Sequence, residues 1–252
     1  MAQAMPINER DLPYERLCNN LSAGRMTMGG DSHGQRISDR MWEQLGRLSY
    51  RGGQAALLPW NRGGPRLLTD GVSFTNFVKG GMKASSYATH PKFIDLKLSE
   101  ANIAIIAVGG NDLDDNAMSG RQTCRQVLSD IFWIVRQLQD LGKQAYVVPL
   151  PFRFSTRRKP LLQYQTEVRY VNKRLKNQLG NRVINLRGDF FKIEAFEAWN
   201  HVLNGVQVTE FVHLRPENYA LLASDILNWV LSDLTLVSSR PSTISPYINM
   251  NN

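Results

Sequence analysis

The stretch ANIAIIAVGGND, residues 101–112, decides the fold class. Its first eight residues form a nearly unbroken apolar run rich in Ile, which is typical of a strand buried on both faces of a parallel sheet. The Gly-Gly-Asn-Asp that follows ends the strand. Ligands of such sheets bind beyond the carboxyl ends of the strands. The residues that directly follow each expected strand are therefore the first candidates for a functional site.

Strand-like and helix-like segments alternate on either side of this stretch. Further strands are expected at 25–29, 71–79, 145–150 and 182–186. Apolar residues at helical spacing predict helices over 37–48, 122–141, 168–179 and 216–231. In the helix over 122–141 the apolar stripe runs from Val127 to Leu141, and Gly142 is placed for a C-cap. Connections long enough for helices indicate an α/β fold with a parallel sheet covered on both faces.

One folded domain is expected, over residues 25–232. Residues 1–24 form a polar N-terminal arm, and residues 233–252 form a polar tail whose last part is rich in Ser and Pro. Neither an internal repeat nor a second apolar block separated by a linker marks another domain.

The composition and the N-terminal sequence predict the cellular compartment of the protein. No run of about 18 apolar residues occurs, so no membrane span is expected. Polar and charged residues interrupt the N-terminus, which lacks the apolar core of a signal peptide. The two cysteines, Cys18 and Cys124, are then expected as reduced thiols and not as a disulfide. These features predict an intracellular protein, cytoplasmic or nuclear.

The chain is basic, with a net charge of +8 and a pI near 9.7. Such a charge fits a solvated surface, and it also fits a surface that attracts nucleic acid or another polyanion. Two segments mix cations with aromatic residues, as a phosphate-contacting surface does. Their basic residues are Arg153, Arg157, Arg158, Lys159, Arg169, Lys173, Arg174 and Lys176.

A candidate nucleophile, Ser32, and a candidate base, His213, lie next to two of the expected elements. Ser32 lies in GDSHG after the first strand, where flanking glycines allow a tight turn that exposes the hydroxyl. The alternative is a turn with an N-capping serine. His213 ends EFVH just before the last helix, where a surface histidine is the alternative. Glu210, three residues earlier, is a candidate to hold the second nitrogen of the imidazole.

Two further blocks supply hydrogen-bond donors for an oxyanion. Gly80-Gly81 follows the second strand, and its backbone N–H groups can approach a ligand closely. Asn111, in GGND, follows the third strand and carries an amide donor. Each block is also ordinary turn chemistry. The four blocks together give the order nucleophile, oxyanion glycine, oxyanion asparagine and base.

This order resembles the SGNH hydrolase family, also called GDSL-like lipases and esterases. GDSHG corresponds to its Ser block (Ser32), GGMK to its Gly block (Gly81 or Gly80), GGND to its Asn block (Asn111), and EFVH to its His block (His213). The resemblance spans about residues 25–232. It implies a three-layer α/β/α sandwich with a parallel, flavodoxin-like sheet. It also implies a serine esterase that works through an acyl-enzyme without cofactor or metal.

The last block departs from the family, because Glu210 stands where an aspartate is usual. Three outcomes stay open: the loop adjusts to the longer side chain, Ser32 and His213 work as a dyad, or the activity is lost. Hydrolysis and acyl transfer to another alcohol also stay open, since both use the same site.

Other classes fit less well. GDSHG also matches the nucleophile elbow G-x-S-x-G of α/β-hydrolases, but only about thirty residues precede Ser32, too few for the strands that come before that elbow. The four histidines and two cysteines lack metal-ligand spacing. The rival from a different class is an SGNH scaffold of weak or no activity that binds nucleic acid or a partner through its basic surface. Some retrotransposon-encoded proteins resemble that combination.

Overall fold

The computed structural model describes residues 25–51, 66–67, 73–115, 120–156, 159–187, 190, 192–203 and 206–238. The N-terminal arm and most of the polar tail therefore lie outside the described residues, as does Cys18. The strands are β1 (Arg25–Gly30), β2 (Arg66–Leu67), β3 (Ser73–Val78), β4 (Ile103–Ala107), β5 (Gln144–Val147), β6 (Trp199–Leu203) and β7 (Val206–Glu210). The α-helices are α2 (Ser32–Arg51), α3 (Ala84–Tyr87), α4 (Pro91–Leu98), α5 (Gly110–Asp115), α6 (Arg121–Asp140), α7 (Leu161–Leu179) and α8 (Pro216–Ser238).

The main sheet has the order β2-β3-β1-β4-β5. Strands β3, β1, β4 and β5 run parallel, and the two-residue β2 is antiparallel to β3 at one edge. At the other edge Val183 makes a parallel bridge to Val147, in the position of a fifth parallel strand. Counting only parallel segments, the spatial order is second, first, third, fourth and fifth, which is the flavodoxin-like order. The predicted fold class is confirmed.

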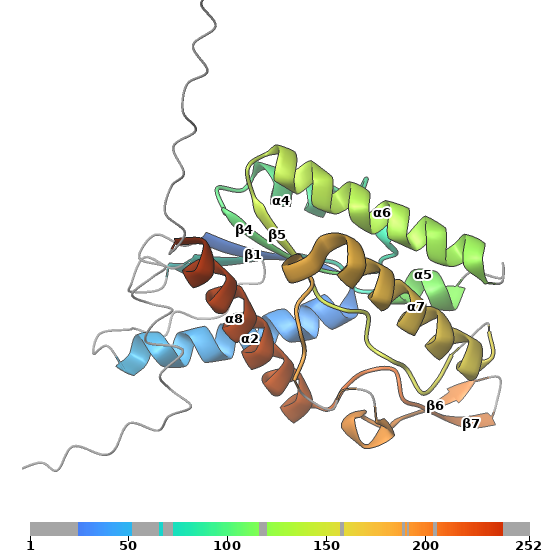
Figure 1. Cartoon of the computed structure of the whole chain (residues 1–252). Helices are drawn as coiled ribbons and strands as arrows, with labels where there is room; N and C mark the ends of the chain where they lie inside the picture. Colours follow the sequence, from blue (N-terminus) through green and yellow to red (C-terminus); the bar gives the residue numbers. More distant parts are fainter. Residues whose placement is uncertain are drawn as a thin grey trace, which may run out of the picture.

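Helices cover both faces of this sheet. Helices α2 and α8 pack against each other, and α2 lies on β1, β3 and β4. Helix α4 packs on β1 and β3 as well, and Figure 1 shows α2 and α4 on opposite sides of the sheet, with α6 on the side of α4. The arrangement is three layers, helix, sheet and helix.

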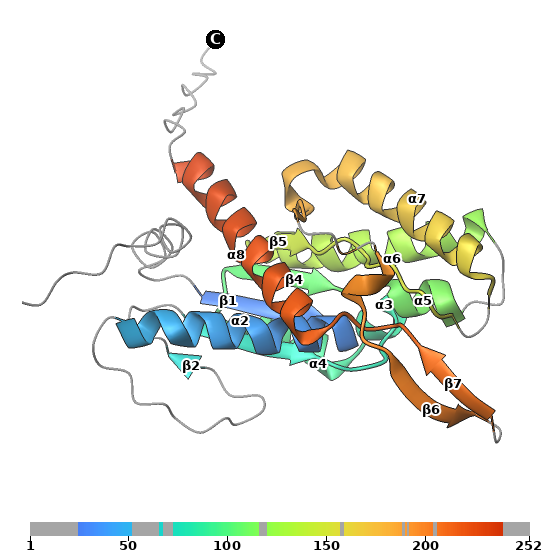
Figure 2. The same ribbon diagram turned by 90° about the horizontal axis from the view of Figure 1, so that it is seen from below.

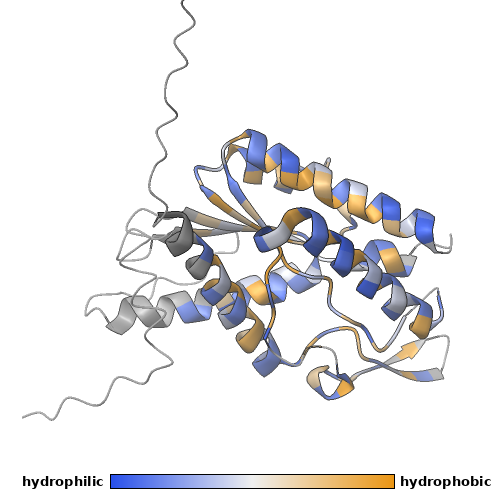
Figure 3. Cartoon of the chain, in the orientation of Figure 1, coloured by the Kyte–Doolittle hydropathy of each residue, from blue (hydrophilic) through white to orange (hydrophobic). Residues whose placement is uncertain are grey.

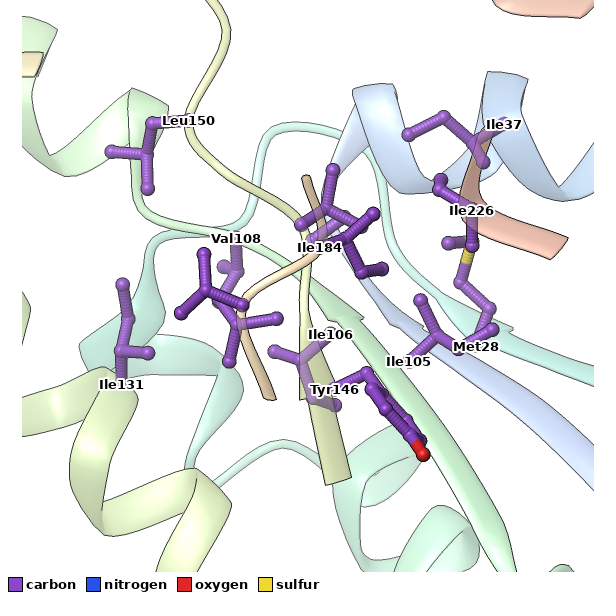
Figure 4. Close-up of a cluster of buried hydrophobic side chains, with 14 of the residues drawn as sticks. Met28, Ile37, Ile105, Ile106, Val108, Ile131, Tyr146, Leu150, Ile184 and Ile226 are labelled. Atoms are coloured by element: carbon purple, nitrogen blue, oxygen red, sulfur yellow. The ribbon is translucent and has the colours of Figure 1, made fainter. Parts of the chain in front are cut away.

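Alternation along the strands builds the core. Successive side chains of a strand point to opposite faces, so Ile105 and Ile106 of β4 serve different layers. Figure 4 shows Ile105 beside Met28 and Ile226, in the layer of α2 and α8. All five residues of β4 are buried, as the unbroken apolar run predicts. Each large apolar side chain buried in this way stabilises the fold by about 1.5–3 kcal/mol.

Helix α6 shows how the apolar stripe sets the packing. Its stripe is buried over Val127–Leu138 and faces the sheet, while the polar side faces outward (Figure 3). Leu141, predicted as part of this stripe, is instead exposed. The reason is that the helix ends at Asp140, and Gly142 with φ +75° turns the chain away.

Other boundaries differ from expectation for local reasons. Helix α2 begins at Ser32 and not at residue 37, because Asp31 caps it: the His33 N–H donates to Asp31 Oδ1 at 2.9 Å. Helix α8 continues to Ser238, past residue 232, where the domain was expected to end. Strands β6 and β7, which were not predicted, form an antiparallel hairpin that extends away from the main sheet (Figure 2).

Candidate active site

The turn between β1 and α2 places Ser32 at the carboxyl edge of the sheet. Gly30 has φ +146°, and a Cβ there would lie 1.9 Å from the carbonyl oxygen of Ala107, so only glycine fits. The Asp31 N–H donates to that same oxygen at 3.0 Å. As the first residue of α2, Ser32 has an N–H without an acceptor inside the helix, and the N-terminal end of a helix favours negative charge.

His213 comes from the segment between β7 and α8 and meets this serine. Its Nε2 lies 3.2 Å from Ser32 Oγ, across 181 residues of sequence. Burial of the imidazole, helped by the charges of Arg36 and Arg153, lowers the pKa of His213 to about 4. The ring is therefore neutral at pH 7 and able to accept the proton of the serine hydroxyl.

Glu210 does not join this pair. It is the last residue of β7, and its side chain is buried. Within the described chain, the His213 ring hydrogen-bonds to Ser32 alone, and the residues that lower the His213 pKa include no carboxylate. The chain that follows Glu210 is tied to other parts of the structure, since Phe211 N–H donates to Ser155 Oγ and Leu214 bridges to Phe196.

The sequence left a dyad of Ser32 and His213 open beside a triad completed by Glu210. The observed geometry fits the dyad. The triad with Glu210 remains a prediction from the family pattern, and the described contact is between Ser32 and His213.

The glycine block lies next to Ser32. Lys79 N–H donates to the Gly30 carbonyl at 2.9 Å, which ties the turn after β3 to the end of β1. A Cβ on Gly80 would lie 4.0 Å from the Cβ of Ser32. Gly81 has φ +75° and is exposed, and no described residue accepts its N–H. Gly80 is thus placed near Ser32, and Gly81 follows it with an N–H that faces no described acceptor.

Asn111 completes the convergence. It follows β4 in the first turn of α5, and its Nδ2 donates to the Met82 carbonyl at 3.1 Å. The same nitrogen lies 3.4 Å from Asp31 Oδ2. Because Met82 follows the glycine block and Asp31 precedes Ser32, the amide stands between the two blocks.

The structure therefore brings together Ser32, Gly80-Gly81, Asn111 and His213, all at the carboxyl edge of the sheet. A hydroxyl bonded to a neutral imidazole, beside backbone and amide donors, is the donor set that acyl transfer requires.

Sequence reasoning missed the two residues that flank Ser32 in GDSHG. Asp31 is fully buried, and burial raises its pKa to about 6 against the opposing charge of Arg153. His33 is buried beside His213, with ring centroids 5.1 Å apart, and its Nδ1 lies 2.7 Å from the Tyr219 hydroxyl. Burial lowers the pKa of His33 well below 6.5, so this ring is also neutral. Their position next to Ser32 was the available signal.

A small cavity lies beside Asp31 and His33. Asp31 and His33 line it together with apolar residues that include Ile37, Leu214 and Leu222. Its volume is about 20 Å³, room for about one water. Neither Ser32 nor His213 lines it, so the cavity does not receive the group that the serine would attack.

The predicted basic surface needs a correction. Arg153 and Lys159 are not on the surface: their side chains are buried in ion pairs with Asp114 and Glu167. Burial of a cation requires such a partner, and neither is free to meet a phosphate. The exposed basic residues of the set lie on α7: Arg169, Lys173, Arg174 and Lys176. Arg157 and Arg158 lie outside the described residues.

Among the described helices, none is both long and apolar enough to cross a membrane. The described residues contain no group of three or more His, Cys, Asp or Glu side chains placed to hold a metal ion.

Comparison with solved structures identifies the fold. A GDSL-like lipase from Bacteroides thetaiotaomicron matches with a TM-score of 0.50 and 13% identity, over 89% of this chain and 99% of that chain. An acetyl xylan esterase matches with a TM-score of 0.52 and 14% identity, over 80% and 97%. A psychrotrophic esterase from Pseudoalteromonas matches with a TM-score of 0.50 and 11% identity, over 84% and 99%. The chain has the SGNH-like hydrolase fold.

No protein-family model matches the chain, and no curated protein matches it. At the identities above, the likeness concerns the fold alone.

Proposed function

We propose that this protein is a serine esterase that hydrolyses a carboxylic ester through an acyl-enzyme. The observation that carries the proposal is the 3.2 Å contact between Ser32 Oγ and His213 Nε2, made beside the glycine turn and Asn111. Solved esterases share the fold, which supports the reaction class.

The reaction assigns a role to each group. Ser32 Oγ attacks the ester carbonyl carbon while His213 Nε2 takes its proton, which gives a tetrahedral oxyanion and an imidazolium. The N–H groups of Ser32 and Gly81 and the Asn111 Nδ2 donate to the oxyanion. The imidazolium returns its proton to the leaving alkoxide as the C–O bond breaks.

A second attack releases the acid. Water attacks the acyl-enzyme, gives a proton to His213, and the acid leaves as Ser32 Oγ recovers that proton. If another alcohol takes the place of water, the same steps transfer the acyl group.

The nucleophile is tested by covalent labelling. A fluorophosphonate should label the wild-type protein, and short p-nitrophenyl esters should be hydrolysed. Ser32→Ala should lose both. Ser86→Ala, at an exposed serine of α3, is the matched control and should keep both. Labelling that persists unchanged in Ser32→Ala would show that another residue is the nucleophile.

The oxyanion donor is tested by its effect on turnover. Removing one such donor typically lowers kcat by about 100- to 1,000-fold. Asn111→Ala should show a loss of that size with little change in KM and a retained circular dichroism spectrum. A mutant with nearly full kcat would assign Asn111 to the turn alone.

The alternative is a scaffold without catalysis that binds a polyanion. The observation that favours it is the set of exposed cations on α7. Failure of the wild-type protein to react with a fluorophosphonate, together with salt-sensitive nucleic-acid binding, would favour this function over the esterase.

A further inference from the structure

Arg153 is the buried cation of this edge of the sheet. It lies in the segment between β5 and α7 and is 3% exposed. Its Nη1 donates to Asp114 Oδ2 at 3.0 Å, and its guanidinium carbon lies 5.7 Å from the centre of the Tyr164 ring. The proposed reaction gives this residue no step, although its guanidinium touches one of the groups that the reaction uses.

That group is the Asn111 amide. Arg153 Nη2 donates to Asn111 Oδ1 at 2.6 Å. A guanidinium has hydrogen-bond donors and no acceptor. It can therefore donate to the oxygen of an amide, but it cannot pair with the NH₂ group, which is also a donor. The contact therefore settles which way the amide faces.

The orientation matters because the two ends of an amide are alike in shape and opposite in hydrogen bonding. With Oδ1 on Arg153, Nδ2 faces Met82 and Asp31, on the side of the glycine turn and the nucleophile. A flipped amide would present an oxygen lone pair to the oxyanion and repel it.

We propose that Arg153 is a positioning residue of the Ser32 site, which holds the Asn111 amide with Nδ2 toward the oxyanion. The inference rests on the proposed esterase function. It makes the buried arginine a determinant of kcat that never contacts the substrate.

To position Asn111, the side chain at residue 153 needs two donor nitrogens in a fixed planar arrangement. Separate nitrogens of Arg153 serve Asp114 and Asn111. Lysine keeps the charge but offers one ammonium group in place of a planar fork, so it does not hold both partners in the same geometry. Arg153→Lys therefore keeps a cation beside Asp114 and loosens Asn111. Arg153→Met would remove the cation altogether, and loss of folding would hide the effect on the amide.

A double-mutant cycle separates positioning from a general structural role. The set is wild type, Arg153→Lys, Asn111→Ala and the double variant, each checked for folding by its melting temperature. Arg153→Lys should lower kcat about tenfold and change KM less than about twofold, since the loss falls on the transition state. In the Asn111→Ala background the same substitution should change kcat less than about twofold, because its partner is gone. Arg169→Lys, at an exposed arginine of α7, is the matched control and should leave kcat unchanged.

A second readout does not depend on turnover. The side-chain amide signals of Asn111, identified by their loss in Asn111→Ala, should exchange with solvent slowly in the wild type and about tenfold faster in Arg153→Lys. Wild-type kcat in Arg153→Lys, an equal loss in both backgrounds, or unchanged amide exchange would each overturn the inference. Absence of any esterase activity in the wild type would refute the proposed function instead, and the exchange measurement would still decide the role of Arg153.

Discussion

The pH dependence of ester hydrolysis should extend to unusually acidic values. The pKa of His213 is lowered to about 4, by burial first and then by Arg36 and Arg153. At pH 5.5 a base of that pKa is about 97% neutral, whereas an ordinary histidine of pKa about 6.5 is about 9% neutral. In an Asp31→Asn variant, which lacks the other group that titrates in this range, kcat/KM at pH 5.5 should thus stay close to its value at pH 7.5, about tenfold above what an unperturbed histidine would allow.

One other group titrates in this range and needs its own variant. Burial raises the pKa of Asp31 to about 6, and its carboxylate faces the Asn111 amide. Protonation of Asp31 would cause a fall in kcat/KM near pH 6, and this fall would not report the pKa of His213. Asp31→Asn removes this limb and leaves the limb of His213.

The causes of the low pKa predict the sign of a second change. Arg36→Gln removes one of the two positive charges that disfavour the imidazolium, so the acid limb should move to higher pH. Arg40→Gln, one turn further along α2, is the matched control, because Arg40 pairs with Glu43 and does not affect the His213 pKa.

The assay is the initial rate of p-nitrophenyl acetate hydrolysis between pH 3.5 and 8, read where nitrophenol and nitrophenolate absorb equally. An acid limb near pH 6.5 that persists in Asp31→Asn would refute the reasoning, because it would show a His213 pKa close to the ordinary value.

Three further predictions follow from single contacts. Glu210→Gln and Glu210→Asp should leave kcat within about twofold, roughly 0.4 kcal/mol, because the Glu210 carboxylate does not bond to His213. A large loss of kcat in Glu210→Gln would show instead that Glu210 completes a triad. Gly30→Ala should lower the free energy of unfolding in urea by more than about 3 kcal/mol through its clash with Ala107, while Gly142→Ala, whose Cβ meets nothing within 4 Å, should cost about 1 kcal/mol; equal losses would contradict the close packing at Gly30. If α7 binds nucleic acid, affinity should fall steeply with salt, and Lys173→Glu with Arg174→Glu should weaken binding without changing ester hydrolysis; no binding at low salt would leave these cations as solvated surface.

The strands were predictable because their burial is written into local composition. The apolar run over residues 101–108 allowed no exposed face, and the structure buries all of β4. The site blocks were predictable for a related reason, since a parallel sheet gathers whatever follows its strands at one edge. Asn111 Nδ2 thus lies 3.4 Å from the carboxylate of Asp31, the residue before Ser32, although the two are 80 positions apart in the printed sequence.

Features that depend on distant partners were not predictable in this way. Arg153 shares a basic segment with Lys159, so its composition suggested surface, and only its contacts with α5 show that it is internal. The reach of Glu210 depends on how the backbone of residues 211–214 is tethered, which spacing alone does not reveal. The hairpin β6–β7 did carry a local signal, the Asn204-Gly205 pair between alternating residues, which is typical of a tight hairpin turn.

The hydrogen bond from Asp31 N–H to the Ala107 carbonyl distinguishes two parts of the site. It couples the ends of β1 and β4, the adjacent strands that Ser32 and Asn111 follow. The His213 imidazole lies outside these strands, on the segment that connects the protruding hairpin to α8. The sheet therefore joins the segments that carry Ser32 and Asn111 directly, whereas the position of His213 is set by the chain between β7 and α8.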